Sequence, residues 1–134
     1  MIQMRKSLKI SNFYPKEIEI VSVSEKGNSF EMKVKSRTKR QNCPCCGKES
    51  DSYHSTYVRK VRDLPILNKS VFLTITAYKY YCDNTECQQK VFSEELNGFT
   101  GKGRRMTERL ESLIVAIGLN TNCEQLPGYA AAWV

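Results

Sequence analysis

The sequence lacks the patterns that accompany common kinds of catalysis. It contains no glycine-rich phosphate-binding loop and no nucleophile motif. Glu94 and Glu95 are adjacent, so in an extended segment their side chains should diverge, and the other carboxylates have no evident partner for acid–base work. The sequence therefore predicts a protein that is not an enzyme, with no catalytic residues.

Long apolar runs are missing as well. No stretch approaches the roughly 20 apolar residues that a membrane-spanning helix needs, so we expect a soluble protein without a membrane partner. The N-terminus does not resemble a secretory signal, which argues against an oxidising compartment. Outside an oxidising compartment the cysteines stay reduced, which indicates a cytoplasmic protein.

Histidine occurs once, at position 54, whereas cysteine occurs six times. Cys43 and Cys46 form a C-x-x-C pair, and Cys82 and Cys87 form a C-x4-C pair further along the chain. Two short-range thiol pairs joined by a long loop are a usual way to present four sulfur atoms tetrahedrally to zinc. The spacing predicts one structural Zn²⁺ ion held by these four cysteines.

Other uses of the cysteines remain open at this point. The alternatives are two disulfides, a redox-active C-x-x-C, unrelated buried cysteines, and an iron site, since iron also accepts four thiolates. Cys45 lies between two ligands and should point away from the ion, and Cys123 fits a small buried residue. With four cysteines available, His54 is interpreted as a polar or partly buried contact rather than a ligand.

Period-two alternation predicts a β-rich first part. Residues 17–24 and 29–37 form a hairpin around a turn at 25–28, with a bulge at Val21. Residues 70–81 form the longest strand, with Val71, Leu73, Ile75 and Ala77 on one face, and residues 90–96 form another short strand or an extended segment. Residues 1–16 are interpreted as a short leader with a helical turn at 7–12, and residues 53–63 as a mixed segment. Strands that alternate with thiol pairs are the plan of a zinc ribbon.

The composition changes at residues 97–103, where three glycines suggest a linker. Apolar residues at helical spacing then predict a helix over residues 107–117, with Thr107 as N-cap and Gly118 as its stop. A turn at 119–122 and a second helix disrupted at Pro127 would make an incomplete helix-turn-helix. We therefore expect an α+β protein with two parts, a zinc ribbon over residues 1–97 and a helical segment over 98–134.

The formal net charge of +7 favours a polyanionic partner. The basic residues cluster on either side of the first cysteine pair and again before the helix. Phosphate contact and a merely solvated basic face are both open for these clusters. The candidate DNA-binding residues are Arg37, Lys39, Arg40, Arg59, Lys60, Arg62, Lys102, Arg104, Arg105 and Arg109.

Several short motifs follow one another in an order typical of one protein family. They are Cys-Pro-x-Cys-Gly at 43–47, His54-Ser-x-Tyr57-x-Arg59, Asp63-Leu64-Pro65, Cys82 and Cys87, Phe92-Ser-Glu94, and Arg105-Met-Thr107-Glu-Arg109-Leu110. Over roughly residues 40–120 the chain resembles the N-terminal zinc finger of bacterial insertion-sequence transposases of the ISL-three family.

The resemblance implies a zinc-binding module that recognises duplex DNA, at transposon ends or more generally, with Cys43, Cys46, Cys82 and Cys87 as ligands. Family members continue through a complete helix-turn-helix and an Asp-Asp-Glu nuclease domain, whereas this sequence ends at Val134. We therefore expect a chain truncated before the catalytic domain, so that transposase catalysis does not carry over. The alternative is a zinc-ribbon module for protein–protein interaction that dimerises through its C-terminal helix.

Overall fold

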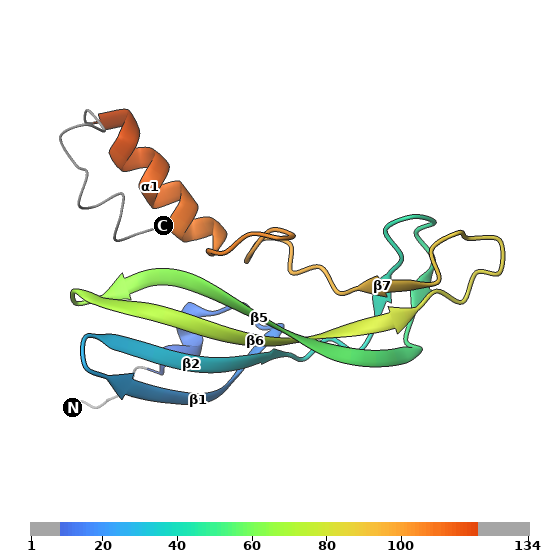
Figure 1. The fold of residues 1–134 in the computed structure, drawn as a ribbon, viewed down its shortest axis with the longest axis horizontal. Helices are drawn as coiled ribbons and strands as arrows, with labels where there is room; N and C mark the ends of the chain where they lie inside the picture. The colour runs from blue at the N-terminus through green and yellow to red at the C-terminus, as the bar shows by residue number, and fades with distance from the viewer. Residues whose placement is uncertain (1–8, 121–134) are drawn as a thin grey trace, which may run out of the picture.

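The central strand of the sheet is β6 (Lys69–Tyr81), in a computed structural model that describes residues 9–120. Its apolar side chains alternate, and the predicted face of Val71, Leu73, Ile75 and Ala77 is buried with 0–1 % of each side chain exposed. The main sheet has the strand order β1-β2-β6-β5, and a fifth strand, β7 (Val91–Ser93), pairs with the far end of β6 (Figure 1). Residues 9–120 are thus β-rich with one α-helix, in agreement with the predicted α+β class.

The first two strands, β1 (Ile18–Lys26) and β2 (Ser29–Ser36), pair antiparallel around a two-residue loop. Gly27 in this loop has a φ of +55°, a conformation that residues with a β-carbon rarely adopt. The register shifts between Ile20 and Ser22, so Val21 forms a bulge. On its other side β2 runs parallel to β6, with Met32 opposite Leu73. A parallel pair needs a long connection, and here it contains β5 and the first cysteine pair.

The longest strand is β5 (Tyr53–Ile66), where the sequence indicated only a mixed segment. It pairs antiparallel with β6 along nearly its whole length. The connecting loop is Leu67-Asn68, and both residues have positive φ, at 47° and 67°. This combination matches a type I′ hairpin turn, for which Asn-Gly is the usual sequence signal.

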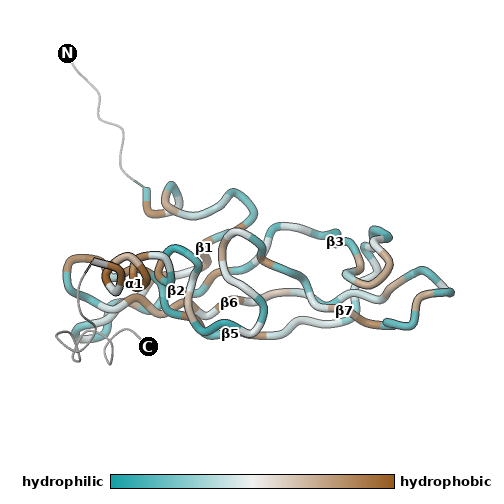
Figure 2. Tube along the Cα trace, turned by 90° about the horizontal axis from the view of Figure 1, so that it is seen from above, coloured by the Kyte–Doolittle hydropathy of each residue, from teal (hydrophilic) through white to brown (hydrophobic). Residues whose placement is uncertain are grey.

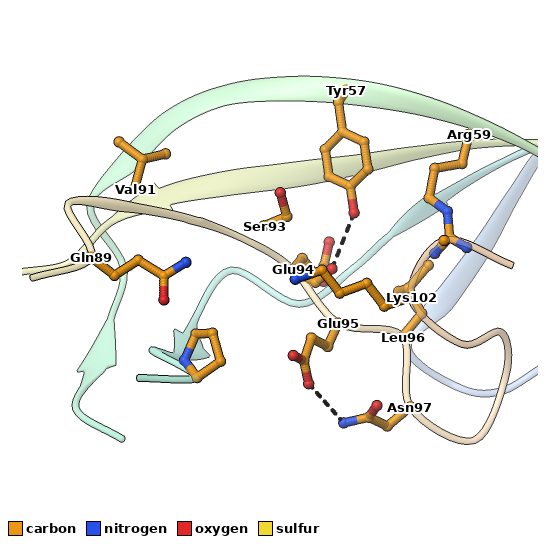
Figure 3. Close-up of a pocket in the computed structure, with 12 residues that line it drawn as sticks. Tyr57, Arg59, Gln89, Val91, Ser93, Glu94, Glu95, Leu96, Asn97 and Lys102 are labelled. Carbon is orange, nitrogen blue, oxygen red and sulfur yellow. Dashed lines mark hydrogen bonds between the residues drawn. The ribbon is translucent and has the colours of Figure 1, made fainter. Parts of the chain in front are cut away.

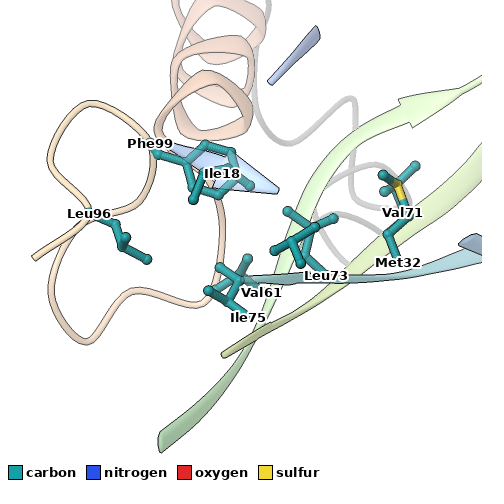
Figure 4. Packing of buried hydrophobic residues seen from close by; sticks show 9 residues of the cluster. Ile18, Met32, Val61, Val71, Leu73, Ile75, Leu96 and Phe99 are labelled. Atoms are coloured by element: carbon teal, nitrogen blue, oxygen red, sulfur yellow. The ribbon is translucent and has the colours of Figure 1, made fainter. Parts of the chain in front are cut away.

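The main core lies on one side of the sheet, which we call the inner face (Figure 4). Met32, Val61 and Leu73 contribute to it from three strands. The 97–103 segment, interpreted as a linker, sends Phe99 into this core with 6 % of its side chain exposed. The N-terminal residues also join it, since Ile10 and Tyr14 pack against the same cluster. The division of the chain after residue 97 stays a prediction.

The N-terminal segment contains a short 3₁₀ helix, η1 (Ile10–Phe13). The predicted turn at 7–12 is therefore shifted toward the C-terminus within the described residues. In Figure 2 this segment lies beside the sheet, and α1 and the β3/β7 region occupy opposite ends of the molecule, as they also do in Figure 1.

The helix α1 spans Glu108–Asn120. Thr107 caps it as predicted, because its Oγ1 accepts the backbone N–H of Leu110 at 3.4 Å. Gly118 does not stop the helix, which continues for two more residues. The prediction was wrong there because a glycine lowers helix stability by only about 1 kcal/mol and ends a helix only where the next turn cannot form. The predicted turn at 119–122 was wrong for its first two residues, which belong to this helix. The rest of that turn, the second helix and Cys123 lie outside the described residues.

Two further short strands, β3 (Gln41–Asn42) and β4 (Glu49–Ser50), form a separate small hairpin around the first cysteine pair. Within residues 9–120, the one α-helix falls short of the length and hydropathy that crossing a membrane requires.

Candidate metal centre

Two tight turns carry the four cysteines. The β3–β4 hairpin places Cys43 and Cys46 in a turn closed by the backbone hydrogen bonds Cys43 N–H to Lys48 O (2.9 Å) and Gly47 N–H to Cys43 O (2.7 Å). Gly47 has a φ of +79°, which explains why a glycine follows the second ligand. The other turn connects β6 to β7, and the hydrogen bond from Cys82 N–H to Lys90 O (2.8 Å) closes it. Each pair is therefore held by its own small piece of sheet.

The four sulfur atoms form one compact group, in which all lie within 4.8 Å of one another. Cys43 Sγ is 3.8 Å from Cys87 Sγ, and Cys46 Sγ is 3.6 Å from Cys82 Sγ. A tetrahedral zinc ion with Zn–S bonds of about 2.3 Å places its sulfurs about 3.8 Å apart, whereas a disulfide needs about 2.05 Å. The group can bind one structural zinc ion, as the sequence predicted.

The thiol groups influence one another strongly. A hydrogen bond from the backbone of Lys48, together with Asn84, lowers the pKa of the Cys46 thiol to about 6. Backbone hydrogen bonds act to lower the pKa of Cys82 and Cys87 too, but desolvation and the neighbouring thiols outweigh them, and both pKa values are raised. A bound metal cation would stabilise the thiolate forms of Cys82 and Cys87, whose ionisation is otherwise disfavoured.

The four clustered sulfur atoms are called the metal group. The two other residues considered as possible ligands, Cys45 and His54, lie outside it. Cys45 is exposed and is not one of the four clustered cysteines. His54 is exposed as well, its Nδ1 lies 2.7 Å from Ser55 Oγ, and its ring packs edge-on against Tyr81 with 4.8 Å between centroids. The structure therefore agrees with His54 as a polar contact rather than a ligand, although it is not partly buried.

A serine–aspartate cluster joins the two turns and was not found from the sequence. The hydroxyl of Ser52 donates to the Asp83 carboxylate at 2.8 Å, and buried Ser50 donates to it at 3.3 Å. Ser50 Oγ also bonds to the Tyr81 carbonyl, just before Cys82. Such contacts fix ligand orientation around a metal. An aspartate directly after a ligand cysteine was the one available sequence signal.

Aromatic residues fill the space beneath the metal group. Tyr80 and Phe92 are each 2 % exposed and form one buried cluster with Cys43 and Cys87. Their ring centroids are 5.9 Å apart, and the Tyr80 hydroxyl donates to the Thr38 carbonyl at 3.2 Å. Tyr80 is thus a core residue. This cluster is distinct from the main core, so the metal centre has its own hydrophobic support.

Glu94 is a buried carboxylate between the two cores, with 3 % of its side chain exposed. It accepts hydrogen bonds from the Ser36 hydroxyl and from the backbone N–H of Tyr78 (3.2 Å). Desolvation is the main influence and raises the pKa of Glu94 above its usual value, although both hydrogen bonds act to lower the pKa. Glu95 is exposed, so the two adjacent carboxylates diverge as expected.

Replacing Glu94 by glutamine should change how stability depends on pH. Because the folded-state pKa is raised, ionisation destabilises the fold as pH rises from the ordinary carboxyl pKa through the folded value. The free energy of unfolding of the variant should therefore improve relative to wild type as pH rises above the ordinary carboxyl pKa of 4.5. Urea unfolding across this range measures it, with exposed Glu95→Gln as control. Parallel pH profiles for Glu94→Gln and wild type would contradict the expectation.

A second buried carboxylate, Asp63 on β5, joins segments far apart in sequence. It accepts hydrogen bonds from the Oγ1 of Thr107, the N-cap of α1, and from the Nε of Arg109 on α1, each at 2.8 Å, and from the Tyr14 hydroxyl at 2.8 Å. Arg109 completes a two-point ion pair through its Nη2, and its Nη1 donates to the Phe13 carbonyl at 2.6 Å. The network attaches both α1 and the N-terminal segment to the sheet.

The ten candidate DNA-binding residues do not form one continuous group. Arg109 is engaged by Asp63, and the Arg59 guanidinium donates to the carbonyls of Gly101 (2.7 Å) and Arg104 (3.0 Å). Arg62 stacks over the Phe72 ring, 4.9 Å from its centroid. The exposed members are Arg37, Lys39, Arg40, Lys60, Lys102, Arg104 and Arg105. Arg40 and Arg104 each also contact a glutamate at 3.5 Å, at the surface.

A polar cleft of about 540 Å³ opens between the first cysteine turn and the 95–103 segment (Figure 3). Tyr57 points into it, and its hydroxyl donates to the Glu94 carbonyl oxygen at 3.1 Å. Arg59 and Lys102 line one end, and the Asn97 side chain donates to Glu95 at 3.3 Å. The motif residues Tyr57 and Arg59 thus serve to hold the 94–104 segment in place.

Comparison with protein families identifies residues 39–87 as similar to the zinc-finger of transposase IS204/IS1001/IS1096/IS1165. The matched segment includes both cysteine pairs, so it confirms the resemblance for the zinc finger. The resemblance beyond residue 87 stays a prediction. No curated protein and no solved structure matches the chain.

Proposed function

We propose that this chain is the zinc-binding, DNA-binding module of a transposase-like protein, and that it binds duplex DNA without catalysing a reaction. The observation that carries the proposal is the match of residues 39–87 to a transposase zinc finger, together with the four-sulfur group inside that segment. Cys43, Cys46, Cys82 and Cys87 hold the zinc ion in this proposal. The ion shapes the fold, since four thiolates leave no coordination position for a substrate.

The charge of the chain supports a polyanionic partner, and the structure refines which residues we propose as contacts. Arg59 and Arg109 are left out, because their guanidinium groups are hydrogen-bonded within the protein. The exposed residues Lys102 and Arg105 remain, beside the edge of β5, where the Arg62 N–H donates to the Arg105 carbonyl at 2.9 Å. Lys60 lies on the same strand as Arg62. Arg37, Lys39 and Arg40 form a second basic group before the first cysteine turn.

Binding to duplex DNA should depend steeply on salt. Each phosphate contact releases counterions, so four contacts give a slope of about −3.6 in log K against log salt. Fluorescence anisotropy with a labelled duplex of about 20 base pairs, between roughly 50 and 300 mM salt, measures the slope. Binding that does not change with salt, or no binding at low salt, would contradict a DNA-binding function.

One observation favours a second candidate function, a protein-interaction module that dimerises through α1. Val115 and Leu119 on this helix are 58 % and 81 % exposed, and contiguous exposed apolar side chains often mark an interface. Light scattering separates the two functions, because a stable dimer with no affinity for DNA would support the interaction module.

A further inference from the structure

The side of the sheet opposite the main core is largely polar, and we call it the outer face. Its members alternate with the buried residues along the central three strands, whereas Arg109 of α1 bonds to Asp63 on the inner face. The outer face consists of Glu31, Lys33 and Lys35 from β2, Phe72, Thr74 and Thr76 from β6, and Val58, Lys60 and Arg62 from β5.

The register places two lysines on either side of one threonine. Thr74 is paired with Lys33 on the parallel strand β2 and with Lys60 on the antiparallel strand β5. Because neighbouring strands lie about 4.8 Å apart, the two lysines start about 10 Å apart and point to the same side. Lys33 and Lys60 are far apart in sequence, so this juxtaposition exists only in the folded sheet.

Carboxylates offset the positive charge of this face only in part. Glu31 pairs with Lys26 at 2.6 Å and Glu19 with Lys35 at 3.8 Å. Among the described residues, neither Lys33 nor Lys60 has a carboxylate within ion-pair distance, and both side chains are exposed. A hydrogen bond from Lys26 is the main cause of the lowered pKa of Glu31, and Lys60 and Lys33 lower it further through their charge.

We propose that the phosphate backbone of duplex DNA docks on the outer face, with Lys33 and Lys60 binding phosphates on either side of Thr74. The inference rests on the proposed function and adds to it a surface, since Lys33 was not among the candidate contacts. Ammonium groups bind phosphate oxygens, and a threonine hydroxyl between them can donate a further hydrogen bond to the same backbone. The phosphates also relieve the repulsion between the two lysines, neither of which forms an ion pair with a carboxylate of the described residues.

The test compares two double variants that change the net charge equally. Lys33→Gln with Lys60→Gln removes the proposed contacts, and Lys9→Gln with Lys16→Gln removes two exposed lysines of the N-terminal segment, which packs on the inner face. At 0.1 M salt the outer-face variant should bind the labelled duplex about 60-fold more weakly, with the salt slope reduced by about 1.8. The N-terminal variant should retain the wild-type slope.

The outcomes separate this inference from the function on which it rests. Equal losses in both variants, or none in the outer-face variant, would overturn the outer face while leaving DNA binding intact. Tighter binding of wild type to a single strand of the same length would overturn the assignment to duplex DNA. Failure of wild type to bind the duplex at low salt would overturn the proposed function itself. Thermal unfolding checks that both variants are folded, as exposed side chains lead us to expect.

Discussion

Replacing Cys43 by serine is expected to abolish zinc binding and to unfold the end of the protein that contains the two cysteine turns. Cys43 is 1 % exposed, and its sulfur lies in both the metal group and the aromatic cluster with Tyr80 and Phe92. A structural zinc site contributes about 10–16 kcal/mol of apparent binding free energy at neutral pH, far more than a small domain has in reserve. Elemental analysis and circular dichroism of the purified variant measure the two losses.

Cys45 provides the matched control, because it is an exposed cysteine in the same turn but outside the metal group. Cys45→Ser should keep its zinc and unfold at the wild-type temperature. A Cys43→Ser protein with full zinc content and an unchanged spectrum would show that the four sulfurs are not the ligands.

Replacing Asp63 by alanine is expected to destabilise the protein by about 3–5 kcal/mol, the usual effect of removing one partner from a buried ion pair. The substitution leaves the partly buried Arg109 guanidinium without its carboxylate. It also deprives the Tyr14 and Thr107 hydroxyls of their acceptor. Urea unfolding monitored by circular dichroism measures the loss, with exposed Asp51→Ala as control.

The effect of Asp63 should also depend on pH. Desolvation acts to raise the pKa of this carboxyl, but hydrogen bonds from Arg109, Thr107 and Tyr14 outweigh it, so the pKa is lowered. The stabilisation is therefore complete above the ordinary carboxyl pKa and is lost as pH falls through the folded-state value. The difference between Asp63→Ala and wild type should shrink in acid. A variant within 1 kcal/mol of wild type at neutral pH, an estimate well below the expected loss, would contradict a structural role for the network.

The metal group was predictable from the sequence because its signal is local. Each cysteine pair is a short motif, and the spacing alone indicated which four of six cysteines to group. The alternating face of β6 and the N-cap at Thr107 were found for the same reason. These features depend on residues within one turn or one strand of each other.

Strand β5 was missed because its inward positions are not uniformly apolar. Arg59 and Asp63 alternate with Val61 on the inner face, so the period-two pattern is broken. Their polar groups are satisfied by Gly101 and Arg109, which lie more than 40 positions along the chain. A pattern read along one strand cannot reveal partners at that distance. The Leu67-Asn68 turn gave no help, since leucine rarely adopts positive φ.

The motifs that carried the family resemblance turn out to have structural roles in this fold. Asp63, Thr107 and Arg109 come from two separate motifs and meet in one hydrogen-bonded network. The sequence marked these residues without indicating why they occur together. Arg109 in particular was interpreted as a phosphate contact because its charge was visible and its buried partner was not.

The metal content of the wild-type protein is the most direct test of the claim that zinc organises this fold. Protein purified without added metal should contain about one zinc per chain by elemental analysis, as a closed four-thiolate site predicts. Removal of the metal with a chelator should unfold the cysteine turns. Stoichiometric iron with a red colour, or a metal-free chain that retains its full structure, would contradict a fold organised by zinc.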